Sequence, residues 1–136
     1  MTATAAIHPG MTGSATTRVT REVTVAHFHT EMPEVYGTPF MIYLMEVAAS
    51  NAIQPLLPEG CVSVGAEVNV RHLAATPVGH TVTATATVTA VGKRTVAFSV
   101  EAFDNVERIG EGTHVRAVID RSRFERNLAG KALPET

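Results

Sequence analysis

Residues 37–57, GTPFMIYLMEVAASNAIQPLL, decide the fold of this chain, because they are the one segment typical of a long helix. Thr38 is a good N-cap, and Pro39 suits the first helical position, where its missing N–H costs nothing. Pro55 ends the pattern. Apolar side chains recur at the i, i+3 and i+4 spacing of a buried helix face over three turns: Phe40, Met41, Leu44, Met45, Ala48 and Ala52.

One carboxylate interrupts this apolar stretch, since Glu46 lies between Met45 and Val47. Glu46 lies either in water at the helix edge or among apolar side chains, where desolvation raises the pKa of a carboxyl and suits it to act as a base or nucleophile. Thr38 has two readings as well. It caps the helix, or it lies where backbone N–H groups stabilise developing negative charge, or it does both.

The remainder of the chain is typical of strands. Period-two alternation of apolar and polar residues, as in half-buried strands, marks four ranges after the helix: 61–72, 81–91, 95–103 and 106–120. A Val-rich segment at 17–26 predicts a strand before the helix, and residues 121–128 suggest a short charged helix. Residues 1–16 are rich in Thr, Ala and Gly, so we expect a flexible tail, followed by a single domain over residues 17–136.

These elements predict an α+β fold of the hot-dog type, in which an antiparallel sheet of about five strands wraps around one long central helix. His72 continues the apolar parity of segment 61–72, so it is expected to face the helix as a core histidine or a functional one. A small sheet leaves an edge strand unpaired. We therefore expect a homodimer, and a dimer of dimers stays an open alternative.

Composition narrows the function. The 136 residues are 45% hydrophobic and carry a net charge of −2, which gives no reason to expect nucleic acid or an anionic membrane as partner. Cys61 is the single cysteine, so the chain has no internal disulfide and fits a reducing compartment such as the cytoplasm. No apolar run is long enough to cross a membrane, and the first residues do not resemble a secretory signal.

No metal site is expected, because the remaining histidines do not combine with cysteines or carboxylates into a ligand set. Four of them are assigned to loops or to the outer parity of strands: His27, His29, His80 and His114. The chain also has no phosphate loop, nucleophile elbow or dinucleotide fingerprint.

Three motifs resemble the hot-dog thioesterases of the fluoroacetyl-CoA thioesterase type: TPFMIYLME at 38–46, VRHLAATPVG at 70–79 and GEGTHVRAVI at 110–119. The resemblance covers most of residues 33–119. It implies hydrolysis of short acyl-CoA thioesters, with no cofactor, by a threonine, a glutamate and a histidine. These roles fall on Thr38, Glu46 and His72, and Gly65 matches a glycine beside the acyl pocket.

The resemblance leaves the acyl group open. In the fluoroacetyl-specific enzyme the lid before the helix is longer and carries a phenylalanine that closes over the acyl group. Here the lid is shorter and Met32 aligns with that phenylalanine. Met32 is therefore a candidate substrate-binding residue. The resemblance implies thioester hydrolysis for this chain, but it does not specify the acyl group.

Helix geometry adds a constraint, because eight residues place the backbones of Thr38 and Glu46 about 12 Å apart. The two residues either flank a substrate within one chain or meet across a dimer interface, and we favour the shared site. Four cations are candidate partners for CoA phosphates, with ordinary surface charge as the alternative: Arg71, Lys93, Arg94 and Arg116. The rival functions are a non-catalytic acyl-CoA-binding module and a hot-dog hydratase or dehydratase, against which the absence of His from the helix argues.

Overall fold

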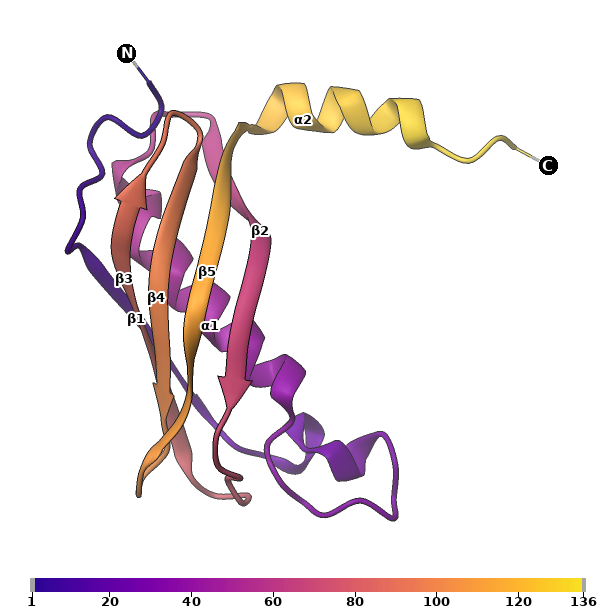
Figure 1. Ribbon diagram of the computed structural model, residues 1–136. Helices are drawn as coiled ribbons and strands as arrows, with labels where there is room; N and C mark the ends of the chain where they lie inside the picture. Colours follow the sequence, from indigo (N-terminus) through magenta and orange to yellow (C-terminus); the bar gives the residue numbers. More distant parts are fainter. Residues whose placement is uncertain (1, 136) are drawn as a thin grey trace.

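Five antiparallel strands curl around one long helix in the computed structural model, which describes residues 2–135 (Figure 1). The strands are β1 (Thr12–Arg18), β2 (Cys61–His72), β3 (Thr81–Val91), β4 (Thr95–Phe103) and β5 (Arg108–Asp120), in the sheet order β1-β3-β4-β5-β2. The helices are α1 (Thr38–Ile53), on one face of the sheet, and α2 (Arg121–Leu128), which projects from the end of β5 (Figure 1). The expected antiparallel α+β architecture is confirmed.

Helix α1 begins one residue away from the expected cap. Gly37 occupies the N-cap position in an extended conformation, and Thr38 is already the first helical residue, so its hydroxyl does not cap the helix. The hydroxyl is instead bonded to His72. After Ile53 the chain tightens into a 3-10 turn, Gln54–Leu56, that contains Pro55.

The buried face of α1 packs against the sheet. The side chains that it buries are Met41, Leu44, Met45, Ala48, Ala49, Ala52 and Ile53. The closest approach is at Gly13 on β1, where an added Cβ would overlap the backbone of Ala48 and Ala52. Small residues on both elements therefore let the helix lie directly on the sheet, as close-packed interiors require.

The prediction for the N-terminal part was wrong at its boundary. Thr12–Arg18 is strand β1, paired with β3 from Thr12↔Thr87 to Arg18↔Thr81, so the predicted tail extends into the sheet. Ile7 is also buried in the core, at 3% exposure. The predicted strand at 17–26 contains two short 3-10 helices instead. The strand was missed because β1 is built from Thr, Ser, Ala and Gly, whose alternation carries little hydrophobic contrast.

Strand β2 forms one edge of the sheet and pairs only with β5 within the described chain. A bulge between Gly65 and Glu67 shifts the register and reverses the facing of the side chains, as an extra residue in one strand does. Ser63 and Gly65 therefore face inward before the bulge, although the apolar parity of residues 61–72, which includes Val62 and Val64, predicts the opposite facing. Among residues 2–135, no helix has the length and apolarity needed to cross a bilayer.

Candidate active site

The start of α1 and the end of β2 meet through their side chains. Thr38 Oγ1 lies 2.8 Å from Nδ1 of His72. Desolvation lowers the pKa of His72 below its ordinary 6.5, and the nearby Ala74 backbone opposes this shift. The imidazole is therefore neutral near pH 7. Its other nitrogen, Nε2, is buried and has no hydrogen-bond partner within residues 2–135.

This pair lines one hollow, and a second hollow beside it shares Met32 with the first. One, of about 400 Å³, is lined by Thr38, His72 and Met32 among others. The second is apolar, has a volume of about 190 Å³, and is lined by Met32, Phe28 and Phe40 among others. The rings of Phe28 and Phe40 stack with their centroids 6.0 Å apart. Met32 thus lies beside both the Thr38–His72 pair and an apolar hollow.

Glu46 lies in a different place, facing β5 and β2. Its Oε2 accepts a hydrogen bond from Nη1 of Arg116 at 3.5 Å. Arg116 is only 7% exposed, and it also donates to the side chain and the carbonyl of Ser63, at 2.7 and 2.9 Å. Burial lowers the pKa of Arg116, which the charge of Glu46 partly offsets. A fixed guanidinium therefore sets the orientation of the Glu46 carboxylate.

Gly65 makes room for this carboxylate. A Cβ at Gly65 would overlap Oε2 of Glu46 and lie 3.4 Å from the ring of His114. The position therefore tolerates no side chain while Glu46 holds its present rotamer. The structure brings Glu46 and Gly65 together, and it brings Thr38, His72 and Met32 together.

Two buried residues beside Glu46 were misplaced by the sequence analysis. His114 was assigned an outer position, yet it is 1% exposed, and Arg116 was considered as a surface partner for phosphate. Nδ1 of His114 donates to the carbonyl of Glu67 at 2.8 Å, and Nε2 accepts from Arg116 at 3.2 Å, so these partners require the neutral Nδ1–H tautomer. Val118 is buried on the same face of β5, but Val115, Ala117 and Ile119 on the opposite parity are also apolar, so the residue pattern did not reveal that His114 and Arg116 lie inside.

The two groups are far apart within one chain. His72 is seven residues beyond Gly65 on β2, which corresponds to about 23 Å at the usual rise of a strand. Along α1, Thr38 and Glu46 are separated by about 12 Å. These backbone separations place Glu46 and the Thr38–His72 pair at different points along α1 and β2.

A curled antiparallel sheet around one helix, with polar side chains gathered at β2, defines the hot-dog class. A hot-dog-like protein from Thermanaerovibrio acidaminovorans superposes with a TM-score of 0.87 at 26% identity, covering 99% of this chain and 100% of that one. The solved fluoroacetyl-CoA thioesterase FlK superposes with a TM-score of 0.88 at 38% identity, covering 93% and 98%. The hot-dog prediction is thereby confirmed.

Sequence comparison specifies the family. The model of the fluoroacetyl-CoA-specific thioesterases matches residues 19–122. A fluoroacetyl-CoA thioesterase from Streptantibioticus cattleyicolor is 46% identical over 101 residues, which are 74% of this chain and 73% of that protein. The chain belongs to the fluoroacetyl-CoA-specific thioesterase family, and the resemblance inferred from its motifs is confirmed.

Proposed function

We propose that this protein hydrolyses short-chain acyl-CoA thioesters to a free acid and CoA. The observation that carries the proposal is the 2.8 Å contact between Thr38 Oγ1 and His72 Nδ1 beside an open hollow. A hydroxyl at a helix N-terminus, bonded to a neutral imidazole, fits the stabilisation of a carbonyl oxygen that gains negative charge. The related thioesterases make thioester hydrolysis the reaction to test first.

In the proposed reaction the thioester carbonyl oxygen lies at the start of α1. With the proton of His72 on Nδ1, Thr38 Oγ1 accepts that N–H and donates its own proton to the carbonyl oxygen. Glu46 either takes a proton from the attacking water or attacks the carbonyl carbon itself, forming an anhydride that water then cleaves. The C–S bond breaks. When Glu46 acts as the base, the departing thiolate receives the proton that Glu46 took from the water. When Glu46 attacks the carbonyl carbon, the proton comes from the water that then cleaves the anhydride.

The separation of Glu46 from His72 favours a site shared by two copies of the chain. Strand β2 is an unpaired edge, and residues 65–69 in its centre are exposed. Antiparallel pairing of two β2 edges about a two-fold axis brings the end of one β2, with His72 and Thr38, toward Gly65 and Glu46 of the other. We therefore infer a homodimer with two composite sites. A mass measurement in solution distinguishes it from a monomer and from a dimer of dimers.

The acyl group is proposed to be small. The apolar hollow beside Met32, of about 190 Å³, leaves space for a few heavy atoms beyond the carbonyl. Met32 is 45% exposed at the rim, so its flexible side chain can adapt to more than one short acyl group. The cytoplasm is the proposed location, because CoA thioesters as substrates and a free Cys61 both suit a reducing compartment.

A thiol-release assay over acetyl-, fluoroacetyl-, propionyl-, butyryl- and benzoyl-CoA tests the proposal. We expect release with at least one short acyl-CoA, and loss of release on Glu46→Gln substitution. If no thiol is released while acyl-CoA raises the melting temperature, the protein is the non-catalytic binding module. If a 2-enoyl-CoA gains water without releasing thiol, it is a hydratase.

A further inference from the structure

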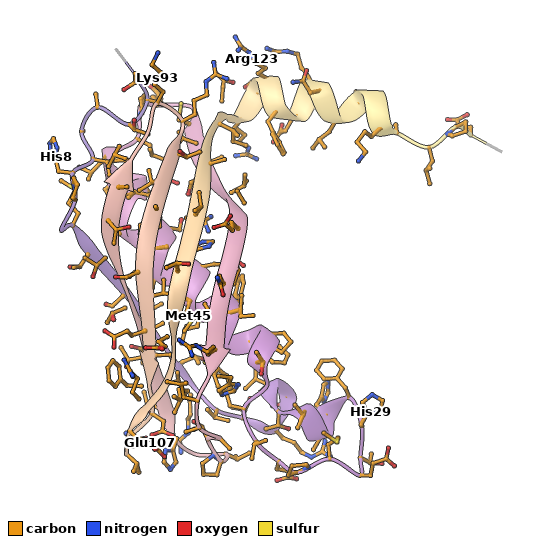
Figure 2. The ribbon with its side chains drawn as sticks, in the orientation of Figure 1. His8, His29, Met45, Lys93, Glu107 and Arg123 are labelled. Carbon is orange, nitrogen blue, oxygen red and sulfur yellow. The ribbon has the colours of Figure 1, made fainter. Side chains whose placement is uncertain are left out.

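A buried histidine, His114, lies beside Glu46 and has no part in the reaction proposed above. It belongs to β5, is 1% exposed, and its ring stacks on Phe98 of β4 with the centroids 6.1 Å apart. Its Nε2 lies 4.0 Å from Oε2 of Glu46, beyond hydrogen-bond distance. By contrast, His8 and His29 are exposed and lie far apart on the outside of the molecule (Figure 2). The position of His114 therefore calls for an explanation that the exposed histidines do not need.

Arg116 links His114 to Glu46, because both accept from the same guanidinium nitrogen. Nη1 of Arg116 donates to Nε2 of His114 at 3.2 Å and to Oε2 of Glu46 at 3.5 Å. The two hydrogens of this nitrogen lie in the guanidinium plane at a fixed angle. Holding one of them on His114 therefore fixes the direction in which the other meets the carboxylate.

Ser63 holds the remainder of the same guanidinium. Its hydroxyl accepts from Nε of Arg116 at 2.7 Å, and its carbonyl accepts from Nη2 at 2.9 Å. Together with the two bonds of Nη1, these bonds use four of the five N–H groups of the guanidinium. Ser63 thus holds Nε and Nη2, and His114 is the neutral acceptor that holds Nη1, the nitrogen bonded to Glu46.

The tautomer of His114 is set from the other side of the ring by Glu67. The carbonyl of Glu67, directly after the bulge in β2, accepts from Nδ1 of His114 at 2.8 Å. The proton is therefore on Nδ1, and Nε2 keeps the lone pair that accepts from Arg116. A proton on Nε2 would instead face the N–H of Arg116 and leave the carbonyl of Glu67 without this bond. The bulge is thereby connected to the Glu46 carboxylate through three consecutive bonds.

We propose that His114 is a positioning residue for the reaction: its Nδ1–H tautomer orients the guanidinium of Arg116, which in turn holds the carboxylate of Glu46. The inference rests on the proposed function, because it assigns His114 a role in hydrolysis. Gly65 leaves the space next to the carboxylate and the ring free of any side chain. His114 acts through Arg116, and it neither takes nor gives a proton in the reaction.

Two substitutions that each keep one nitrogen position of the imidazole test the proposal. His114→Gln keeps an acceptor near the position of Nε2, whereas His114→Asn keeps a donor near Nδ1 and does not reach Arg116. We expect His114→Asn to lower kcat about tenfold with KM unchanged, since a misplacement of about 1 Å costs up to about 10²-fold. His114→Gln restores most of that kcat. His8→Asn, the same substitution at an exposed histidine, leaves the kinetics unchanged.

Nuclear magnetic resonance tests the hydrogen bonds without a substrate. In protein labelled with ¹⁵N at histidine, we expect a protonated Nδ1 and an unprotonated Nε2 for His114, whereas the exposed His8 and His29 exchange their protons with water. In protein labelled at arginine, we expect the Nη1–H signals of Arg116 to persist in His114→Gln and to be lost in His114→Asn. The melting temperatures of both variants show whether each of them is folded.

Three results overturn the proposal. A proton on Nε2 of His114 in the unmodified protein contradicts the tautomer, and this measurement holds even if the substitutions unfold the chain. Equal losses of kcat in His114→Gln and His114→Asn show that the ring acts through packing on Phe98. An unchanged kcat in His114→Asn shows that Ser63 alone suffices to hold Arg116. If the unmodified protein hydrolyses no acyl-CoA, the proposed function fails, and the resonance signals of Arg116 still decide whether His114 orients the guanidinium.

Discussion

The hydroxyl of Thr38 and the imidazole of His72 are joined at 2.8 Å, and this bond links the first residue of α1 to the last residue of β2. Thr38 is exposed and Gly37 holds the cap position, so the bond is the one side-chain hydrogen bond that Thr38 makes in the described chain. A contact of this kind fixes the ring and the hydroxyl relative to the helix N-terminus. The bond does not cap the helix, and we propose that it serves the reaction.

Replacing Thr38 with Ala is therefore expected to lower kcat by about 10²-fold, the usual scale for a positioned proton donor. Thr38→Ser keeps the hydroxyl and is expected to retain most of the activity. Steady-state thiol release with acetyl-CoA measures both, and the melting temperature of each variant serves as the control. Wild-type kcat in Thr38→Ala would contradict the role assigned to the hydroxyl.

Gly65 and Gly13 form a matched pair for a second prediction. In Gly65→Ala the new methyl group meets the end of a flexible Glu46 side chain, so the carboxylate is displaced while the fold is retained. In Gly13→Ala it meets the backbone of α1, which cannot move without separating helix and sheet, and overpacking of this kind costs about 1–3 kcal/mol. Urea unfolding and thiol release together should show lost activity in the first variant and lost stability in the second. Full activity in Gly65→Ala would show that the position of Glu46 is not critical.

The elements that the sequence predicted well have strong hydrophobic contrast. Strands β3 and β4 alternate Val, Ala and Phe with Thr, Ser and Glu, and both were predicted with their observed bounds. Strand β1 alternates only small residues and was missed, since its burial comes from the helix lying on Gly13. Local patterns predict an element when its own side chains carry the burial, and they fail when a neighbour supplies it.

The sequence identified the candidate residues individually, but it did not predict which of them contact one another in the fold. The bulge after Gly65 reverses which side chains of β2 face the helix, and the residue pattern does not predict where such a register shift occurs. The pairing of Thr38 with His72 spans 34 residues, and that of Glu46 with Arg116 spans 70. Such contacts depend on how the helix crosses the sheet, which is a property of the whole fold.

Mixed dimers test the shared site directly. If Thr38 of one copy works with Glu46 of the other, a dimer of one Thr38→Ala chain and one Glu46→Gln chain contains one intact site. Random subunit exchange between the two inactive variants then restores about a quarter of wild-type activity, because about half of the dimers are mixed and each has one site of two. Tandem affinity tags isolate the mixed species. An inactive mixed dimer would mean that Thr38 and Glu46 act within one chain.

The half-buried His72 also predicts a pH dependence. Desolvation lowers its pKa in the folded chain below the ordinary 6.5, so the unfolded chain binds more protons between the two pKa values. The free energy of unfolding therefore falls as pH decreases through that window and is unaffected by His72 above it. Urea unfolding at about pH 7 and about pH 5 should show a smaller loss in His72→Gln than in the wild type. An equal loss would show that another group titrates.

The loop after His72 is fastened to the segment before Thr38 through Thr76. Its carbonyl accepts from the N–H of Tyr36 at 2.8 Å, and its hydroxyl donates to Oδ2 of Asp104 at 2.8 Å. Asp104 Oδ1 accepts from the N–H groups of Val106 and Glu107 at 2.8 and 2.9 Å. Thr76 is fully buried, so these bonds join both chain segments that carry the Thr38–His72 pair to the β4–β5 turn.

Asp104→Ala leaves the buried Thr76 hydroxyl and two turn N–H groups without their acceptor, and is expected to lower the free energy of unfolding by about 1–3 kcal/mol. Burial raises the pKa of Asp104, but the N–H groups of Val106 and Glu107, the Thr76 hydroxyl and His80 outweigh it, so the pKa lies below the ordinary 3.8. Its contribution is therefore complete above about pH 4 and disappears as pH falls through the folded-state pKa. Asp104→Asn keeps an acceptor for both amides and should be less destabilised. Urea unfolding of the three proteins measures these differences, and equal stability of Asp104→Ala and wild type would show that the loops are held by other contacts.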